Sequence, residues 1–172
     1  MKGKKVIVGV TGGIAAYKAA ELVRLLVREG ADTRVAMTRH ATQFITPLTL
    51  QTLSGNRVIW DMWAPETHPL DHITWGQDSD LILIAPATAD FIGKMAHGIG
   101  DDFLSTLVIA ATARILLCPS MNTQMYLSQA VQENLGILKA RGCVIMEPGS
   151  GELACRTEGP GRLPDPEDIV EE

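Results

Sequence analysis

The stretch that decides the fold is residues 6–16, which read VIVGVTGGIAA. Its first five residues are a β-branched run around one glycine, as expected for a parallel strand that is buried on both faces. Thr11-Gly12-Gly13 then makes a tight turn. After the turn, apolar residues recur at helical spacing, and Gly30 stands where a C-cap glycine belongs. With a second strand at residues 33–37, this predicts a βαβ unit with a right-handed crossover.

Strands and helices alternate along the rest of the chain. Further strands are predicted at residues 81–85, 115–118 and 144–146, and helices at 47–54, 101–111 and 123–141. The helix at 101–111 carries acidic residues in its first turn, which suits the helix dipole. Residues 60–71 and the glycine- and proline-rich tail at 148–166 are predicted to be loops, and a loop as long as the tail is usually functional or a linker. The expected fold is α/β: a Rossmann-like (flavodoxin-like) doubly wound parallel sheet with helices on both faces, in a single domain over residues 1–172.

The amino-acid composition limits the classes of protein to which this chain can belong. The chain has 172 residues, of which 46% are hydrophobic and 20% charged, as in ordinary globular domains. Its net charge of −5 argues against partners that are nucleic acids or acidic membrane surfaces. The apolar run after the basic N-terminus is too short for a signal peptide, and no stretch approaches the ~18 apolar residues of a membrane span. The three cysteines lack metal-ligand spacing and indicate free thiols. We therefore expect a cytoplasmic protein with a small-molecule substrate and no metal, membrane or nucleic-acid partner.

The turn after the first strand is a candidate phosphate site. Gly12 and Gly13 let an anion approach the backbone amides, and the N-terminus of the following helix adds free N–H groups and a positive dipole end. The turn is not GxGxxG, so it does not specifically indicate a dinucleotide. A βα turn that needs glycine only for its geometry explains these residues equally well.

Two further loops should face the same crevice, because they also follow the carboxyl ends of strands. Residues 86–90 read PATAD, and their small side chains would let a flat ring lie against the backbone. The alternative is a βα loop in which Asp90 caps a helix. Thr38 ends the second strand and can offer a hydroxyl group.

Three side chains are candidates for chemistry. His72, in Asp71-His72-Ile73 just before a predicted strand, can act as a base near neutral pH, although lone histidines are more often structural. Asn122 follows the strand at 115–118 and can donate to a carboxylate. The simpler alternative makes Asn122 a helix cap, with Met121 and Met125 as core residues. Cys155 lies in the tail beside a basic residue, where a thiol can be reactive, can donate a proton, or can be incidental.

The other two thiols differ from Cys155. Cys118 and Cys143 adjoin apolar strands and are predicted to be packing residues.

Five fragments together resemble one family. They are GGIAAYK at 12–18, HI at 72–73, APATAD at 85–90, PSMN at 119–122 with Met125, and AC at 154–155 followed by GPGR at 159–162. In this order and spacing they resemble the homo-oligomeric flavin-containing cysteine decarboxylases over nearly the whole chain. Two positions depart from the family pattern. Arg156-Thr157 replaces the usual Gly-Asp pair, and Asp90 often aligns with asparagine.

The resemblance implies a reaction and a set of roles. FMN is the cofactor, and the residues that hold it are Gly12, Gly13, Ile14, Thr38, Thr88 and Asp90. His72 is the catalytic base, Asn122 binds the substrate carboxylate, and Cys155 donates a proton from a substrate-clamp flap at about 148–166. The residues that bind the substrate are Asn122, Met125, Ala154 and Cys155. The implied reaction is decarboxylation of 4′-phosphopantothenoylcysteine to 4′-phosphopantetheine in coenzyme A biosynthesis, through a thioaldehyde and an enethiolate.

The resemblance also bears on assembly and on rival functions. It implies a homotrimer or a dodecamer with the flavin near a subunit interface. It allows a standalone enzyme or one fused to, or associated with, a phosphopantothenate–cysteine ligase domain. The same fold carries flavin prenyltransferases and peptidyl-cysteine decarboxylases, and the clamp with Cys155 favours the small substrate over both. A non-catalytic regulatory flavoprotein is the alternative from another class, against which His72, Asn122 and Cys155 argue.

Overall fold

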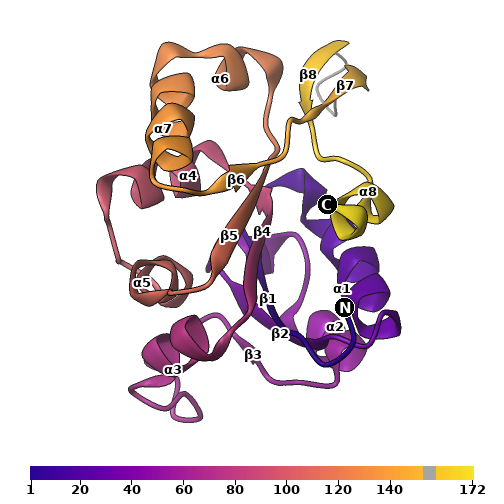
Figure 1. The fold of residues 1–172 in the computed structure, drawn as a ribbon, viewed down its shortest axis with the longest axis vertical. Coiled ribbons are helices and arrows are strands. Elements are labelled where there is room, and N and C mark those ends of the chain that lie inside the picture. Colours follow the sequence, from indigo (N-terminus) through magenta and orange to yellow (C-terminus); the bar gives the residue numbers. More distant parts are fainter. Residues whose placement is uncertain (153–157) are drawn as a thin grey trace.

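A six-stranded parallel sheet forms the centre of the molecule (Figure 1). The computed structural model describes residues 1–152 and 158–172, so the predictions for Ala154 and Cys155 lie outside the described residues. The strands are β1 (Lys5–Val10), β2 (Asp32–Met37), β3 (Val58–Ile59), β4 (Leu81–Ala87), β5 (Arg114–Pro119) and β6 (Val144–Ile145). Their order in the sheet is β3-β2-β1-β4-β5-β6. A separate antiparallel hairpin consists of β7 (Gly149–Glu152) and β8 (Glu158–Arg162).

Helices cover both faces of the sheet. They are α1 (Ala19–Arg28), α2 (Pro47–Ser54), α3 (Asp71–Asp78), α4 (Ala89–His97), α5 (Phe103–Ala110), α6 (Thr123–Leu127), α7 (Gln129–Ala140) and α8 (Pro166–Glu171), with 3-10 turns η1 (Ile14–Lys18) and η2 (Ala41–Gln43). In Figure 1, α1, α2 and α8 lie on one side of the sheet, and α3, α5 and α7 lie on the other. The predicted doubly wound α/β fold is confirmed. Among the helices of the described ranges, none has the length and apolarity to cross a bilayer.

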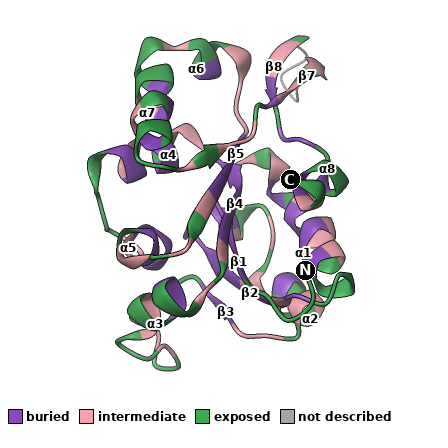
Figure 2. Ribbon diagram, viewed as in Figure 1, coloured by how far each residue is buried: buried purple, intermediate pink, exposed green. Residues whose placement is uncertain are grey.

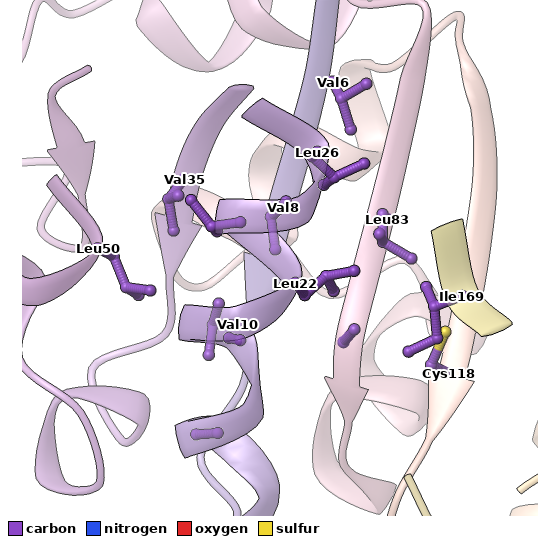
Figure 3. Close-up of a cluster of buried hydrophobic side chains, with 14 of the residues drawn as sticks. Val6, Val8, Val10, Leu22, Leu26, Val35, Leu50, Leu83, Cys118 and Ile169 are labelled. Atoms are coloured by element: carbon purple, nitrogen blue, oxygen red, sulfur yellow. The ribbon is translucent and has the colours of Figure 1, made fainter. Parts of the chain in front are cut away.

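Two hydrophobic cores form because successive strand residues point to opposite faces. Val8 of β1 joins Leu22 and Leu26 of α1 in one cluster (Figure 3), whereas the adjacent Ile7 joins Phe103 of α5 in the other. Figure 2 shows this burial along the strands and on the helix faces that meet them. Each buried aliphatic side chain contributes about 1.5–3 kcal/mol, so burial on both faces supplies the main stabilisation of the sheet.

The winding places a crevice at the carboxyl edge of the sheet. The chain runs from β1 outward to β2 and β3, and then returns through α3 to β4 on the other side of β1. At this reversal the connections after β1 and β4 leave toward opposite faces, and ligands bind at such a switch point. The turn at residues 11–13 and the loop at 87–90 therefore face the same crevice, as predicted.

The tail after β6 was wrongly predicted to be a loop. Its described residues form the β7–β8 hairpin, followed by α8, which has Pro166 at its start. Glycine and proline have low strand propensity, so residue composition conceals these strands. The predicted helix at 123–141 is also wrong, because it is two helices. Ser128 has extended backbone at ψ 140° and its side chain caps α7.

Two short elements were missed, a helix was anticipated only as an alternative, and the start of another helix was misplaced. The segment before β4 is α3, so His72 lies in the first turn of a helix rather than just before a strand. The strand β3, with two residues, was also missed, and the helix α4 was anticipated only in the alternative that placed a helix cap at Asp90. The helix α5 begins at Phe103 and has no acidic residue in its first turn. Asp102 is its cap instead, accepting from the Ser105 N–H at 2.7 Å.

Candidate active site

A cavity of about 650 Å³ occupies the carboxyl edge of the sheet. Its walls come from the connections after β1, β2, β4 and β5 and from the end of β8. The lining comprises residues 12–15, 17, 18, 38, 40, 88–90, 120–122, 125 and 161–163. Small-molecule sites usually occupy about 300–1,000 Å³, so the cavity can hold a ligand of cofactor size.

Most of the predicted site residues meet at this cavity. Those that line it are Gly12, Gly13, Ile14, Thr38, Thr88, Asp90, Asn122 and Met125. His72 is not among the lining residues, because it lies on α3, which packs beside α5. Within one copy of the chain, the structure therefore does not bring His72 to the cavity.

Thr11, predicted only as part of a turn, connects two of the loops that line the cavity. Its side chain is buried, and its hydroxyl donates to the Pro86 carbonyl at 2.7 Å. The same oxygen accepts from the Thr88 N–H at 3.0 Å. One side chain thus joins the glycine turn to the loop after β4. A hydroxyl residue directly after the apolar run at residues 6–10 was the available signal.

Replacing Thr11 by valine is expected to lower the free energy of unfolding by about 2–4 kcal/mol, because each buried polar group that loses its partner costs about 1–3 kcal/mol. The Pro86 carbonyl and the Thr88 N–H both lose theirs. Urea denaturation measures the loss. Thr11→Ser keeps the hydroxyl and is the control, so equal loss of stability in the two variants would contradict this account.

The two glycines of the turn differ in what an added side chain would contact. A Cβ on Gly12 would lie 2.4 Å from the His40 Cβ and 2.9 Å from the His40 carbonyl carbon, so Gly12 is needed for packing between two loops. Among the atoms of the described residues, a Cβ on Gly13 would meet only the Thr88 methyl group, at 3.4 Å. Geometry therefore explains Gly12, as the simpler reading held, whereas Gly13 leaves its side of the backbone open to a ligand.

The loop after β4 carries a cap and a carboxylate. Thr88 caps α4 by accepting from the Phe91 N–H at 3.4 Å, so the alternative that Asp90 is the cap is wrong. Asp90 instead pairs with Lys94, with 3.3 Å between Oδ2 and Nζ. Thr38, which is buried, accepts from the Ala41 N–H at 3.3 Å.

Asn122 combines the two readings that the sequence left open. Its Oδ1 accepts from the Gln124 N–H at 2.8 Å and caps α6. The same residue lines the cavity. The alternative that Met125 fills the core is wrong, because Met125 is exposed and lines the cavity, whereas Met121 packs against the core.

Two cations share one carboxylate at the cavity rim. The Lys18 Nζ lies 2.8 Å from Asp165 Oδ1, and Arg162 lies 3.5 Å from the same oxygen. The hydrogen bond from Lys18 holds the pKa of the Asp165 carboxyl below its usual value. Lys18 and Arg162 both line the cavity, and this cluster has two cations for one carboxylate, so this part of the rim favours an anionic ligand. No sequence pattern indicated this cluster.

The described thiols are poor candidates for proton transfer. Burial raises the pKa of Cys118 to about 12, and burial also raises the pKa of the half-buried Cys143. Both pack against the hydrophobic clusters, as predicted.

Cys118 is therefore expected to resist alkylation in the folded protein. With a pKa of about 12, only about one thiol in 10⁴ is ionised at pH 8, and the thiolate is the form that reacts. Brief treatment with iodoacetamide should leave the Cys118 peptide unmodified, whereas the same treatment in denaturant should modify it, as read by mass spectrometry. Rapid labelling of the native protein would contradict the buried position.

The fold and cavity define a class of protein. A parallel sheet whose switch-point crevice is lined by a glycine turn, hydroxyl groups and small residues is a nucleotide-binding α/β domain. Across residues 1–152 and 158–172, no group of three His, Cys, Asp or Glu side chains is arranged to hold a metal ion. The Flavoprotein family model matches residues 1–172, and the chain belongs to the Flavoprotein family.

Comparison with known proteins supplies relatives over the whole chain. The coenzyme A biosynthesis bifunctional protein CoaBC of Vibrio cholerae is 47% identical over 171 residues, which cover 99% of this chain and 43% of the relative. The CoaBC protein of Escherichia coli is 48% identical over 172 residues, covering 99% and 42%. The chain thus spans less than half the length of these curated relatives.

Solved structures share the fold. A mutant PPC decarboxylase complexed with pantothenoylaminoethenethiol matches with a TM-score of 0.87 and 26% identity, covering 99% of this chain and 96% of that one. The FMN-dependent cysteine decarboxylase SpaF matches with a TM-score of 0.82 and 27% identity, covering 98% and 96%. These matches support the resemblance that the five sequence fragments carry.

Proposed function

We propose that this chain is an FMN-dependent decarboxylase that acts on 4′-phosphopantothenoylcysteine and yields 4′-phosphopantetheine for coenzyme A biosynthesis. The observation that carries the proposal is one cavity that gathers the glycine turn, Thr88 and Asn122 from distant parts of the chain. The relatives named CoaBC and the structural match to a PPC decarboxylase support the same reaction.

The residues of the cavity fit FMN. The helix start at Ile14 offers amides that have no acceptor within the helix, and with Gly13 and the Thr38 hydroxyl it suits a phosphate group. The small side chains after β4 leave room for a flat ring, and Asp90 can accept from its polar groups. When bound, FMN supplies reversible two-electron chemistry, which lets the cysteine moiety be oxidised before CO₂ leaves and reduced again afterwards.

The protein residues bind, orient and move protons. Asn122 donates its amide to the substrate carboxylate, and a neutral donor holds that group without an ion pair that would oppose its departure. Met125 forms an apolar wall, and Lys18 and Arg162 attract the anionic substrate. Cys155, which lies outside the described residues, is the proton donor that the family resemblance implies.

His72 enters this scheme from a second copy of the chain. In the chain segment that leads into the helix of His72, Trp63 is 86% exposed and Leu70 is 54% exposed. At the cavity rim, Ile14 and Tyr17 are 62% and 61% exposed. Exposed apolar patches mark interaction sites, and packing one patch on the other in a neighbouring copy would bury both. It would also bring the imidazole to the cavity as the general base. We propose a homo-oligomer of this kind, with the homotrimer or dodecamer that the resemblance implies.

The longer relatives support proposals about the partner domain and the cellular location of this chain. Their bifunctional name supports a phosphopantothenate–cysteine ligase domain that is fused to this one or associated with it. A cytoplasmic location is consistent with a coenzyme A biosynthesis enzyme and is part of the proposal.

An absorbance spectrum followed by a CO₂ assay tests the function. Purified protein should be yellow with about one flavin per chain, and it should release CO₂ and form 4′-phosphopantetheine from 4′-phosphopantothenoylcysteine. Yellow protein that releases no CO₂ would favour the regulatory flavoprotein. Release only from a peptide with a C-terminal cysteine, or prenyl transfer to flavin, would favour the enzymatic alternatives.

A further inference from the structure

The strand β8 passes over the loop after β5 at a distance that only glycine permits. The Gly161 carbonyl accepts from the Met121 N–H at 2.9 Å. A Cβ built on Gly161 would lie 2.2 Å from the Met121 carbonyl oxygen and 3.3 Å from its carbon. The Gly161 φ of +136° also lies in the region that favours glycine. A side chain at this position would therefore collide with main chain, which cannot rotate away.

A second glycine of the same strand packs on the other neighbour of Asn122. A Cβ on Gly159 would lie 2.7 Å from the Thr123 Oγ1 and 2.8 Å from its methyl group. That hydroxyl is buried, and among the described residues it has no hydrogen-bond partner. The two glycines of β8 thus hold the residues immediately before and after Asn122.

Both the loop and the strand are held on their far sides. The Ser120 N–H donates to the Ala87 carbonyl at 3.0 Å, which ties the loop to the end of β4. Just beyond β8, Asp165 pairs with Lys18 and lies within reach of Arg162. An added atom between strand and loop therefore cannot be absorbed by free movement of β8.

We propose that Gly161, together with Gly159, is a positioning residue for the substrate. By lacking a Cβ, these residues let β8 dock on the loop after β5 and so fix where the Asn122 amide stands in the cavity. This inference rests on the proposed function, in which Asn122 holds the substrate carboxylate. A displacement of about 1 Å in such a contact can lower kcat/KM by about 10²-fold.

Gly161→Ala in the full chain with FMN is the central test. We expect unchanged flavin content, because the glycine turn lies on other elements, and a KM for 4′-phosphopantothenoylcysteine that rises about 10-fold or more with a smaller change in kcat. Gly151→Ala is the matched control. Gly151 has a φ of +153° in the paired strand, yet within residues 1–152 and 158–172 a Cβ there would have no neighbour within 4 Å. Equal KM changes in the two variants would attribute the effect to backbone strain and overturn the proposal.

A rescue experiment separates the contact from general damage and covers a Gly161 variant that fails to fold. Gly159→Ala should raise KM, and adding Thr123→Ala, which removes the two closest atoms, should lower KM again toward the wild-type value. Absence of rescue, with both variants folded, would overturn the proposal.

Hydrogen exchange measures the docking without an enzyme assay. The Met121 amide should exchange about 10-fold faster in Gly161→Ala than in Gly151→Ala, because its acceptor is displaced. Equal protection would overturn the proposal whether or not the protein is active. Wild-type protein that binds FMN but releases no CO₂ would instead contradict the proposed function alone.

Discussion

Replacing His72 by asparagine is expected to lower kcat by about 10²–10⁴-fold, which is the usual contribution of a positioned general base. Asparagine has a similar reach and can form hydrogen bonds, but it cannot accept a proton near neutral pH. Flavin content should stay the same, because the residues proposed to hold FMN lie on other elements. Steady-state CO₂ release and flavin absorbance per chain provide the two measurements.

The control is another histidine outside the cavity. His97 lies at the end of α4, with Nδ1 2.9 Å from the Gly93 carbonyl, and His97→Asn should behave like the wild type. A colourless His72→Asn protein would mean that His72 mainly supports cofactor binding. Full activity would remove His72 from the mechanism.

Mixing two inactive variants tests whether His72 acts across copies. A heterologous interface combines residues from different subunits, so a random one-to-one mixture of His72→Asn and Asn122→Asp restores about a quarter of the sites. If His72 served the cavity of its own chain, every site would keep one defect and the mixture would stay inactive. The subunits must be exchanged first, for example by coexpression.

The fold was predictable where one local signal was enough. Residues 6–16 combine a buried strand, a glycine turn and a helix start, and the carboxyl-edge rule then placed Thr38, Thr88 and Asn122 beside them. Hydrogen bonds and ion pairs between residues far apart in the sequence had no such local signal. Thr11 bonds to residues 75 and 77 positions away, and Lys18 pairs with a carboxylate 147 positions away.

The tail at residues 148–166 shows why residue composition led to a wrong prediction of a loop. Glycines at 159 and 161 suggested a loop, whereas the structure uses them in a strand that must approach Met121 and Thr123 closely. That requirement belongs to the packing partner, so strand propensity cannot reveal it. His72 is a parallel case, because the role proposed for it depends on contact with a second copy of the chain. The sequence of one chain does not indicate which exposed apolar residues would meet in such a contact.

The second large effect is expected at Asn122. The sequence allowed this asparagine to be a helix cap or a donor to the substrate carboxylate. Asn122→Asp keeps an oxygen that can accept from the Gln124 N–H, and aspartate caps helices as well as asparagine does. The melting temperature should therefore change little. The variant nevertheless places a negative charge against the substrate carboxylate, and such like-charge contacts cost several kcal/mol. We expect kcat/KM to fall by about 10²-fold or more, since about 3 kcal/mol corresponds to that factor.

Comparison of Asn122→Ala with Asn122→Asp distinguishes the two explanations, because each predicts that a different variant is the more damaging. The alanine variant loses the cap, at about 0.5–2 kcal/mol of stability, and also loses the amide donor without adding a charge. If Asn122 is only a cap, alanine should be the more damaging change and aspartate nearly silent. If its amide binds the carboxylate, aspartate should be the more damaging to kcat/KM, although it is the more stable protein. Capping cannot explain a more stable but less active Asn122→Asp. A cap acts only on α6, and α6 would be better preserved in Asn122→Asp than in Asn122→Ala.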